Sequence, residues 1–156
     1  MAIQDTIMLT PEGRDRLTEE LQRLRDEDLP NLQRRVRELG EAGDISDDSD
    51  IEITKDELIQ LENRIRDIEW MLEEAEIVEH QDGGEIVEFG STVSVVDDEG
   101  ETETWVIVGP HESDAAEGRI SNVSPVGAAL IGKRVGDKIS VDAPAGEIVY
   151  EITDVQ

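Results

Sequence analysis

Four aspartates fall within seven consecutive positions of this sequence, a density of carboxylates that suits metal chemistry. They are Asp44, Asp47, Asp48 and Asp50, inside the stretch 43–51. Mg²⁺ takes oxygen ligands and is commonly held by one or two protein carboxylates, with water and substrate groups completing the site. Asp44 and Asp47 are three apart and could converge on one side of a turn. Alone they would bind Mg²⁺ weakly, so they need a partner that already holds metal and phosphates.

A structural interpretation of the same stretch stays open. Asp44 or Ser46 could cap the helix that follows, because a side-chain oxygen there accepts a free backbone N–H, and the other acids would then be solvated. Elsewhere the sequence has no glycine-rich phosphate loop, no Ser/His/Asp spacing and no His-x-x-x-His pair. His80 and His111 are isolated in predicted loops, where we expect exposed side chains. A self-contained enzyme is not expected.

Two predicted helices must position the acidic stretch. Thr10 can cap the first, and Pro11 fits its first position, where a missing N–H is harmless. An apolar seam then predicts a helix over about 11–41. Its 3-4 rhythm breaks at the five-residue step from Leu24 to Leu29, beside Pro30, which would remove a backbone bond and kink the helix. The seam comprises Leu17, Leu21, Leu24, Leu29, Leu32, Val36 and Leu39.

The second helix follows the acidic stretch with unbroken 3-4 spacing over three heptads, which is typical of a coiled coil. The short connection makes the first helix its antiparallel partner. At about 1.5 Å per residue, some 30 residues form a rod of roughly 45 Å with the acids at its tip. The seam comprises Ile51, Thr54, Leu58, Leu61, Ile65, Ile68 and Leu72.

The C-terminal half predicts a compact α+β domain. A short helix is expected over 125–131, opened by Ser124-Pro125 and stopped by Gly132. The predicted strands, separated by turns, are 86–89, 92–96, 102–108, 138–141 and 148–155. The fold class is therefore α+β, and the predicted parts are a coiled-coil hairpin over 1–77 with its acidic tip at 43–51, a linker over 78–84 and a small domain over 85–156.

The net charge of −26 is spread over the chain, since residues 1–76 hold 23 acids and 10 bases and residues 77–156 hold 17 acids and 4 bases, or −13 each. One interpretation is a protein that repels nucleic acid as a whole and seeks a basic partner. The interpretation that we prefer is that the host cell has a high internal salt concentration, which screens the repulsion between acidic side chains. With no cysteine and no apolar run that could span a bilayer, we expect a cytoplasmic protein without membrane contact.

A basic group lies close to the tip. Arg34, Arg35 and Arg37 fall near the end of the first helix, and Arg34 and Arg37 share a face, which suits contact with a phosphate backbone. The alternative is that these arginines, with Arg64 and Arg66 of the second helix, only pair with acids of their own helices. The acids available for such pairs are Glu38, Glu41, Glu62 and Glu69.

With its parts in this order, the sequence resembles the bacterial Gre transcript-cleavage factors over nearly its whole length. Residues 9–13, Leu-Thr-Pro-Glu-Gly, resemble their start, and residues 43–47, Gly-Asp-Ile-Ser-Asp, resemble their tip. The most specific match is Ile-Ser-Asn-Val-Ser-Pro at 120–125, followed by 129–133 and 135–137. The resemblance implies a coiled coil that enters the secondary channel of RNA polymerase and an FKBP-like domain that docks at the rim without isomerising prolines.

The family resemblance also implies an activity. In the family, an Asp and a Glu at the tip help to hold a second catalytic Mg²⁺ and orient water, so that the polymerase hydrolyses its own backtracked transcript. Asp44 matches the family's tip aspartate, and Asp47 stands at the position of the family's tip glutamate. We therefore expect an elongation factor, not itself an enzyme, that acts as a monomer on RNA polymerase and the nascent RNA 3′ end, with Mg²⁺ held mainly by the polymerase. Docking is expected to use Ser124, Pro125 and Leu130, and the RNA to face Arg34, Arg35 and Arg37.

The tip departs from the family pattern. Asp47 is one carbon shorter than Glu, or roughly 1.5 Å less in reach, and the usual Asn-Ala-Glu-Tyr that follows is replaced by Asp-Ser-Asp-Ile at 48–51. A tip crowded with aspartates is similar to that of the family's anti-Gre inhibitors. The alternative function is therefore a channel-binding inhibitor that acts on the metal through Asp44, Asp47, Asp48 and Asp50. A third is an adaptor that uses its rod only for protein binding.

Overall fold

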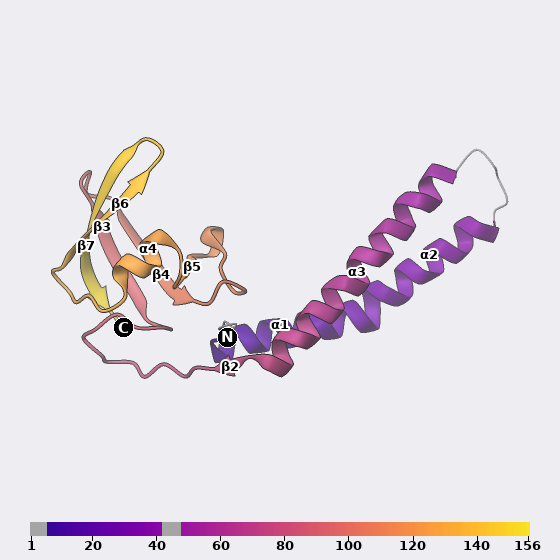
Figure 1. Ribbon diagram of the computed structural model, residues 1–156, viewed down its shortest axis with the longest axis horizontal. Helices are drawn as coiled ribbons and strands as arrows, with labels where there is room; N and C mark the ends of the chain where they lie inside the picture. Colours follow the sequence, from indigo (N-terminus) through magenta and orange to yellow (C-terminus); the bar gives the residue numbers. More distant parts are fainter. Residues whose placement is uncertain (1–5, 42–47) are drawn as a thin grey trace, which may run out of the picture. The chain divides into compact units, whose positions relative to one another are not determined.

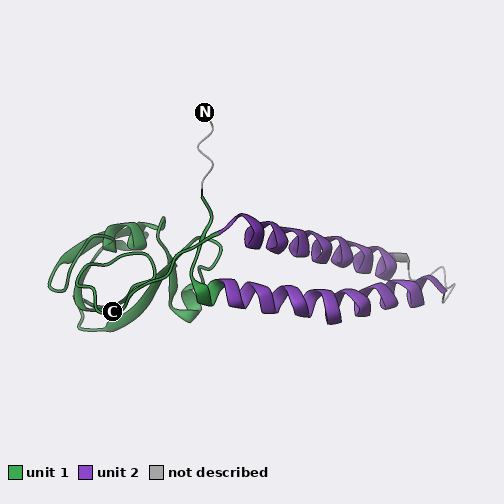
Figure 2. Cartoon of the chain, turned by 90° about the horizontal axis from the view of Figure 1, so that it is seen from below, with its two compact units in different colours: residues 1–13, 76–156 green, residues 14–75 purple. Residues whose placement is uncertain are grey.

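The computed structural model describes residues 6–41 and 48–156. The chain divides into two compact units, Met1–Gly13 with Glu76–Gln156, and Arg14–Ala75 (Figure 2). Strand β1 (Met8–Leu9) precedes the helices, and strand β2 (Glu76–Ile77) follows them and pairs with β1 in parallel. Because of this pairing, both ends of the helical segment return to one unit. The predicted boundaries instead place the first 13 residues with the helices.

The Arg14–Ala75 unit is a helical hairpin. Its first arm runs without interruption through α1 (Pro11–Arg23), the π-helical turn η1 (Leu24–Asp28) and α2 (Leu29–Glu41), which confirms the predicted helix over 11–41. Its second arm is α3 (Asp48–Glu74), and Figure 1 shows α2 and α3 side by side. Residues 48–51 of the predicted tip therefore form the first turn of α3.

The π-helical turn η1 accounts for the five-residue step in the apolar seam. The backbone N–H of Leu29 donates to the carbonyl of Leu24, five residues earlier. One extra residue in the turn keeps both leucines on the side that faces α3, and such π-bulges are a recognised way to shift register within an α-helix. The break that the sequence predicts is present, and it takes the form of a wide turn just before Pro30.

The seam between the two arms is better buried at one end than at the other. Leu17, Leu21, Leu24, Ile65, Ile68 and Met71 are buried. Nearer the tip, the seam residues Leu32, Val36, Leu39, Leu58 and Leu61 are only half-buried. Thr54, the polar seam member, is 2% exposed, and its hydroxyl donates to the Asp50 carbonyl at 2.7 Å. The hairpin is therefore held most firmly at the end away from residues 42–47.

The larger unit holds a five-stranded sheet with the order β5-β4-β3-β7-β6. Neighbouring strands are antiparallel except β4 and β5, which are parallel. The strands are β3 (Thr92–Asp97), β4 (Thr102–Val108), β5 (Arg119–Ser121), β6 (Lys138–Ala143) and β7 (Gly146–Val155). The predicted α+β class is confirmed. Of the predicted segment 86–89, only Ile86 forms a β-bridge, to Arg134.

Helix α4 (Pro125–Leu130) closes the core on one side of this sheet. Its N-cap is Ser124, whose hydroxyl accepts the Gly127 N–H at 3.1 Å and donates to the Ser121 carbonyl at 2.6 Å. Gly132, with φ of +84°, follows its end, so the predicted start and stop signals are confirmed. The buried core comprises Val87, Val93, Val95, Ile107, Leu130, Ile139 and Ile152. Within the described residues, no helix has the length and apolarity needed to cross a membrane.

Candidate functional site

The hairpin brings the end of α2 and the start of α3 together, so that residues 42–47 connect them. Asp44 and Asp47 belong to this connection and lie outside the described residues. Asp48 is the first residue of α3, and Asp50 is exposed in its first turn. Of the four predicted metal ligands, Asp50 is therefore the one whose exposure the structure gives.

The described residues do not form a metal centre by themselves. Across 6–41 and 48–156, no group of three or more His, Asp or Glu side chains is placed to hold an ion. Asp50 contributes its backbone carbonyl to Thr54 and leaves its carboxylate at the surface.

The three arginines near the tip, Arg34, Arg35 and Arg37, are exposed. Arg34 donates to the amide oxygen of Asn31, one turn earlier on the same helix. In the part of the chain that the structure describes, no carboxylate lies within 4 Å of Arg34, Arg35 or Arg37. The alternative of intrahelical pairing with Glu38 and Glu41 is therefore not realised.

Other arginines of the hairpin join its two arms. Arg64 of α3 donates to both carboxylate oxygens of Glu20 on α1, at 2.9 and 3.0 Å, and this hydrogen-bonded carboxylate raises the pKa of Arg64. Arg25 of η1 donates to one carboxylate oxygen of Glu69 on α3. These pairs run between helices, not within one helix as the alternative supposed, and they do not involve the arginines of α2.

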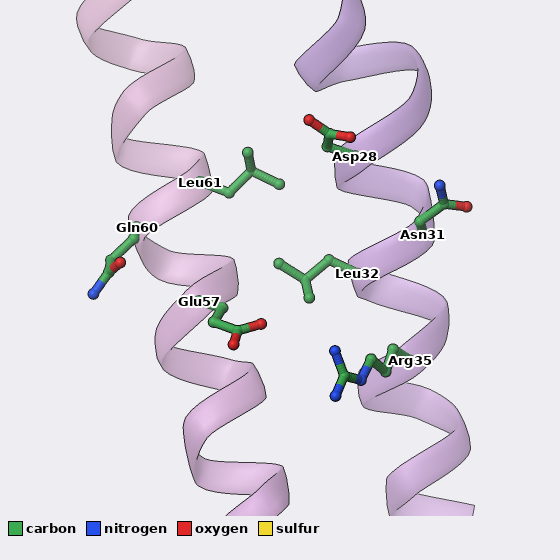
Figure 3. Close-up of a pocket in the computed structure, with 7 residues that line it drawn as sticks. All are labelled: Asp28, Asn31, Leu32, Arg35, Glu57, Gln60 and Leu61. Atoms are coloured by element: carbon green, nitrogen blue, oxygen red, sulfur yellow. The ribbon is translucent and has the colours of Figure 1, made fainter.

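A notch opens between α2 and α3 beyond the π-helical turn (Figure 3). Its volume is about 490 Å³. Leu32 and Leu61 point toward one another from the two helices, while Arg35 and Glu57 point into the gap from opposite sides (Figure 3). Acidic and basic side chains both line the notch, so it favours neither an anionic nor a cationic ligand. We interpret the notch as an incompletely filled part of the seam between the helices and not as a separate binding site.

The predicted docking residues have different environments. Pro125 is exposed at the start of α4 and Ser124 is half-buried as the N-cap. Leu130 has no exposed surface and packs in the core, so it supports α4 and offers no contact to a partner. Beside Ser124 and Pro125 lies an apolar groove of about 490 Å³. Its lining includes Ile120, Ser124, Pro125, Val126, Ile148 and Tyr150.

Two polar residues have roles that sequence reasoning missed. Glu112 is 6% exposed and binds Thr10 near the chain start. The expectation of an exposed histidine is wrong for His80, whose side chain is only 12% exposed, with Nε2 3.1 Å from the Gln156 carbonyl; for His111 it is confirmed. Both partners are distant in sequence, so no local pattern could have found these contacts.

The fold defines a class of proteins in which a coiled-coil hairpin is joined to a small α+β unit. Two family profiles match the chain, "Transcription elongation factor, N-terminal" over residues 7–77 and "Transcription elongation factor, GreA/GreB, C-term" over residues 81–156. The chain belongs to the Gre family of transcription elongation factors, which confirms the resemblance.

Two relatives, compared by sequence, agree with this assignment. The chain is 41% identical to "Transcription elongation factor GreA" of Rhodospirillum rubrum, covering 97% of this chain and 98% of that protein. It is 42% identical to the protein of the same name from Chloroflexus aggregans, covering 95% and 96%. Among solved structures, GreA factor homolog 1 (Gfh1) of Thermus thermophilus is 35% identical, covers 97% of this chain and 99% of its own, and superposes with a TM-score of 0.46.

Proposed function

We propose that this protein rescues backtracked RNA polymerase by entering the secondary channel with its hairpin and stimulating cleavage of the transcript. The observation that carries the proposal is the hairpin itself, in which α2 ends at Glu41 and α3 begins at Asp48. Asp44 and Asp47 lie outside the described residues and fall between these two helices in the sequence. Membership of the Gre family supplies the partner, RNA polymerase.

The tip carboxylates act on a metal that the polymerase holds. Asp44 and Asp47 would each offer an oxygen to a Mg²⁺ ion, which in two-metal phosphodiester cleavage activates water and stabilises the oxygens in line. This chain's part is to place negative charge and hydrogen-bond acceptors beside the attacking water. We expect no catalytic role without the polymerase, because one or two carboxylates hold Mg²⁺ only where a partner supplies the other ligands.

The arginines of α2 hold the displaced RNA. Arg34 and Arg37 are three apart on one helical face, and both are exposed without a carboxylate within 4 Å among the described residues. A phosphodiester backbone offers the charge and geometry that guanidinium groups bind best. In this position they would bind the nascent RNA 3′ end near the tip.

The apolar groove next to α4 docks on the polymerase. Pro125 lies exposed at its edge, and the side chains of Ile148 and Tyr150 line it. A groove lined mainly by apolar side chains fits a partner segment with a few aliphatic residues. This contact would fix the larger unit while the hairpin acts in the channel.

A second candidate function is inhibition without cleavage, and the tip sequence favours it. Asp47 stands at the position of a family glutamate, and residues 48–51 read Asp-Ser-Asp-Ile where the family has Asn-Ala-Glu-Tyr. A carboxylate displaced by about an ångström can lose most of its catalytic effect. Extra carboxylates would then draw the ion away from its productive position.

A transcript-cleavage assay separates the two functions. A stalled, backtracked cognate polymerase is incubated in Mg²⁺ and high KCl with and without the protein, and the RNA length and the restart of elongation are followed. Shortened transcripts that restart support the cleavage factor. Unshortened transcripts with slower elongation support the inhibitor, and a protein with no affinity for polymerase would contradict both.

A further inference from the structure

Three of the four cationic side chains in residues 77–156 lie within six positions, at Lys133, Arg134 and Lys138. The fourth, Arg119, is engaged: its Nε donates to the Glu112 carbonyl at 3.1 Å, and its guanidinium lies 3.6 Å from the Asp114 carboxylate. Among the described residues, no carboxylate comes within 4 Å of the three clustered cations. In a chain of net charge −26, residues 131–138 hold three cations against one carboxylate, that of Asp137.

Aliphatic side chains are exposed on the same loop and on the segment bridged to it. Ile131 is 39% exposed and Val135 55%, and Ile86, which is 43% exposed, forms a β-bridge to Arg134. A cavity of about 410 Å³ opens beside Arg134 and Val135. We call the surface formed by Ile86, Ile131, Lys133, Arg134, Val135 and Lys138 the 131–138 patch.

Three acids lie close to the 131–138 patch without pairing with its cations among the described residues. The Asp137 carboxylate accepts the backbone N–H of Arg134 at 2.9 Å. Glu151 is the register partner of Lys138 across β6 and β7, and Glu85 lines the cavity. None of the three forms an ion pair with the clustered cations within 4 Å. The cationic side chains therefore stay available to an external anion.

Backbone hydrogen bonds hold the loop on both sides. The Val87 N–H donates to the Lys133 carbonyl, and the Gly132 N–H to the Val87 carbonyl, both at 2.8 Å. Further along, the Gly136 N–H donates to the Ile152 carbonyl at 2.8 Å. The turns use Gly132 and Gly136 at φ of +84° and +92°. A surface fixed in this way loses little conformational entropy on binding.

We propose that the 131–138 patch binds a short acidic segment of RNA polymerase that also carries aliphatic side chains. The partner in this inference rests on the proposed function. Cations complementary to carboxylates steer and orient such a segment, and the exposed isoleucines and valine bury its aliphatic groups. The patch follows the C-terminal end of α4, while the docking groove lies at its N-terminal end. It is thus a second contact and not part of the groove.

Nucleic acid fits the 131–138 patch less well. The patch contains no aromatic residue on which a base could stack, and its aliphatic side chains gain nothing from phosphates. Duplex DNA carries about one charge per 1.7 Å of its axis, so it would extend from the patch along a protein of net charge −26. A short acidic peptide segment brings few charges and avoids this repulsion.

The test measures association and dissociation of the full chain with polymerase core enzyme free of nucleic acid, at low and high KCl. We expect Arg134→Gln to lower the association rate about threefold. The triple variant Lys133→Gln/Arg134→Gln/Lys138→Gln should lower it about tenfold and flatten its salt dependence. Gln22→Glu, exposed on α1, makes the same one-unit change in net charge as Arg134→Gln and should bind as the wild type does.

The outcomes are distinct. Wild-type protein that does not bind core enzyme overturns the proposed function itself. Wild-type binding that all patch variants match overturns the patch alone, as does a loss in Gln22→Glu equal to that in Arg134→Gln. A loss seen only with elongation complexes that contain nucleic acid assigns the patch to nucleic acid and overturns the acidic segment. Lys133→Arg/Lys138→Arg keeps the charge and should bind normally, which separates the effect from misfolding.

Discussion

The Glu112 carboxylate accepts two hydrogen bonds from Thr10, one from its backbone N–H at 2.8 Å and one from its hydroxyl at 2.6 Å. The Thr10 hydroxyl oxygen in turn accepts the Gly13 N–H at 3.0 Å, which is the N-cap bond of α1. A Cβ at position 13 would lie 1.9 Å from the Glu112 carboxylate, so this carboxylate packs directly on the first turn. The start of the first helix is thus fixed by a loop 102 residues later in the chain.

Replacing Glu112 by Gln should lower the free energy of unfolding by about 1–2 kcal/mol, because the change removes the charge from buried hydrogen bonds and leaves one donor of Thr10 poorly matched. Urea denaturation followed by far-ultraviolet circular dichroism measures the loss. Glu117→Gln, an exposed change in the same part of the chain, should shift stability by less than about 0.5 kcal/mol. Equal midpoints for the two variants would contradict a special role for Glu112.

The hairpin is predictable because its information is local. The 3-4 spacing from Leu17 to Leu39 and from Ile51 to Leu72 defines both helices, and the step of five at Leu24 marks the π-helical turn. The start of α4 follows likewise from Ser124 and Pro125. In each case the pattern lies within the element itself, so the sequence alone is enough.

The features that sequence reasoning missed depend on contacts between distant segments. Strands β2 and β5 have two and three residues, too few for any periodicity, and exist because β1 and β4 lie beside them. Leu130 is an apolar residue on a short helix, and only the packing of α4 on the sheet shows that it is buried. The candidate tip residues Asp44 and Asp47 remain predictions, since they lie outside the described residues.

The length of the side chain at position 47 should control transcript cleavage. Asp47→Glu restores roughly 1.5 Å of reach and should raise the cleavage rate about tenfold or more, because catalytic carboxylates are sensitive to displacements of an ångström. Asp44→Ala should abolish cleavage in the same assay. Asp56→Asn, exposed on α3 beyond the acidic stretch, serves as the control and should change the rate little. Relief of inhibition by Asp44→Ala would instead identify an inhibitor.

Two classes of arginine in the hairpin should respond differently to removal. Arg34→Ala/Arg37→Ala should weaken crosslinking to the RNA 3′ end in a backtracked complex and leave the unfolding free energy within about 0.5 kcal/mol. Arg64→Ala breaks the pair with Glu20 and should lower stability by about 0.2–1 kcal/mol without affecting the crosslink. An unchanged crosslink in the first variant would remove the arginines of α2 from the RNA contact.

Tyr150 should titrate above the ordinary tyrosine pKa of 10.0, since burial, and then the charges of Glu103 and Asp97, raise its pKa. A raised pKa in the folded state means that the folded protein holds this proton more tightly, so the contribution to stability is complete below pH 10 and is lost as the pH rises through the folded pKa. The sequence has one tyrosine, so tyrosinate absorbance reports it directly. Glu103→Gln should move the titration back toward 10, and titration of the wild type at or below 10 would rule out the burial effect.

Salt should stabilise this protein although it weakens the ion pairs of the hairpin. The pairs of Arg64 with Glu20 and of Arg25 with Glu69 are partly exposed and lose strength when KCl screens them. Against them stand 40 acids and only 14 bases, so repulsion between like charges exceeds the attraction within these pairs, and screening relieves it. We expect the melting temperature to rise by about 5–10 °C between low and molar KCl, corresponding to roughly 1–2 kcal/mol of unfolding free energy.

Choline chloride at equal ionic strength should raise the melting temperature by a similar amount, because screening does not depend on the cation. A melting temperature that falls with KCl would show that the ion pairs outweigh the repulsion. The acidic composition would then be better explained by binding to a basic partner than by a host with high internal salt.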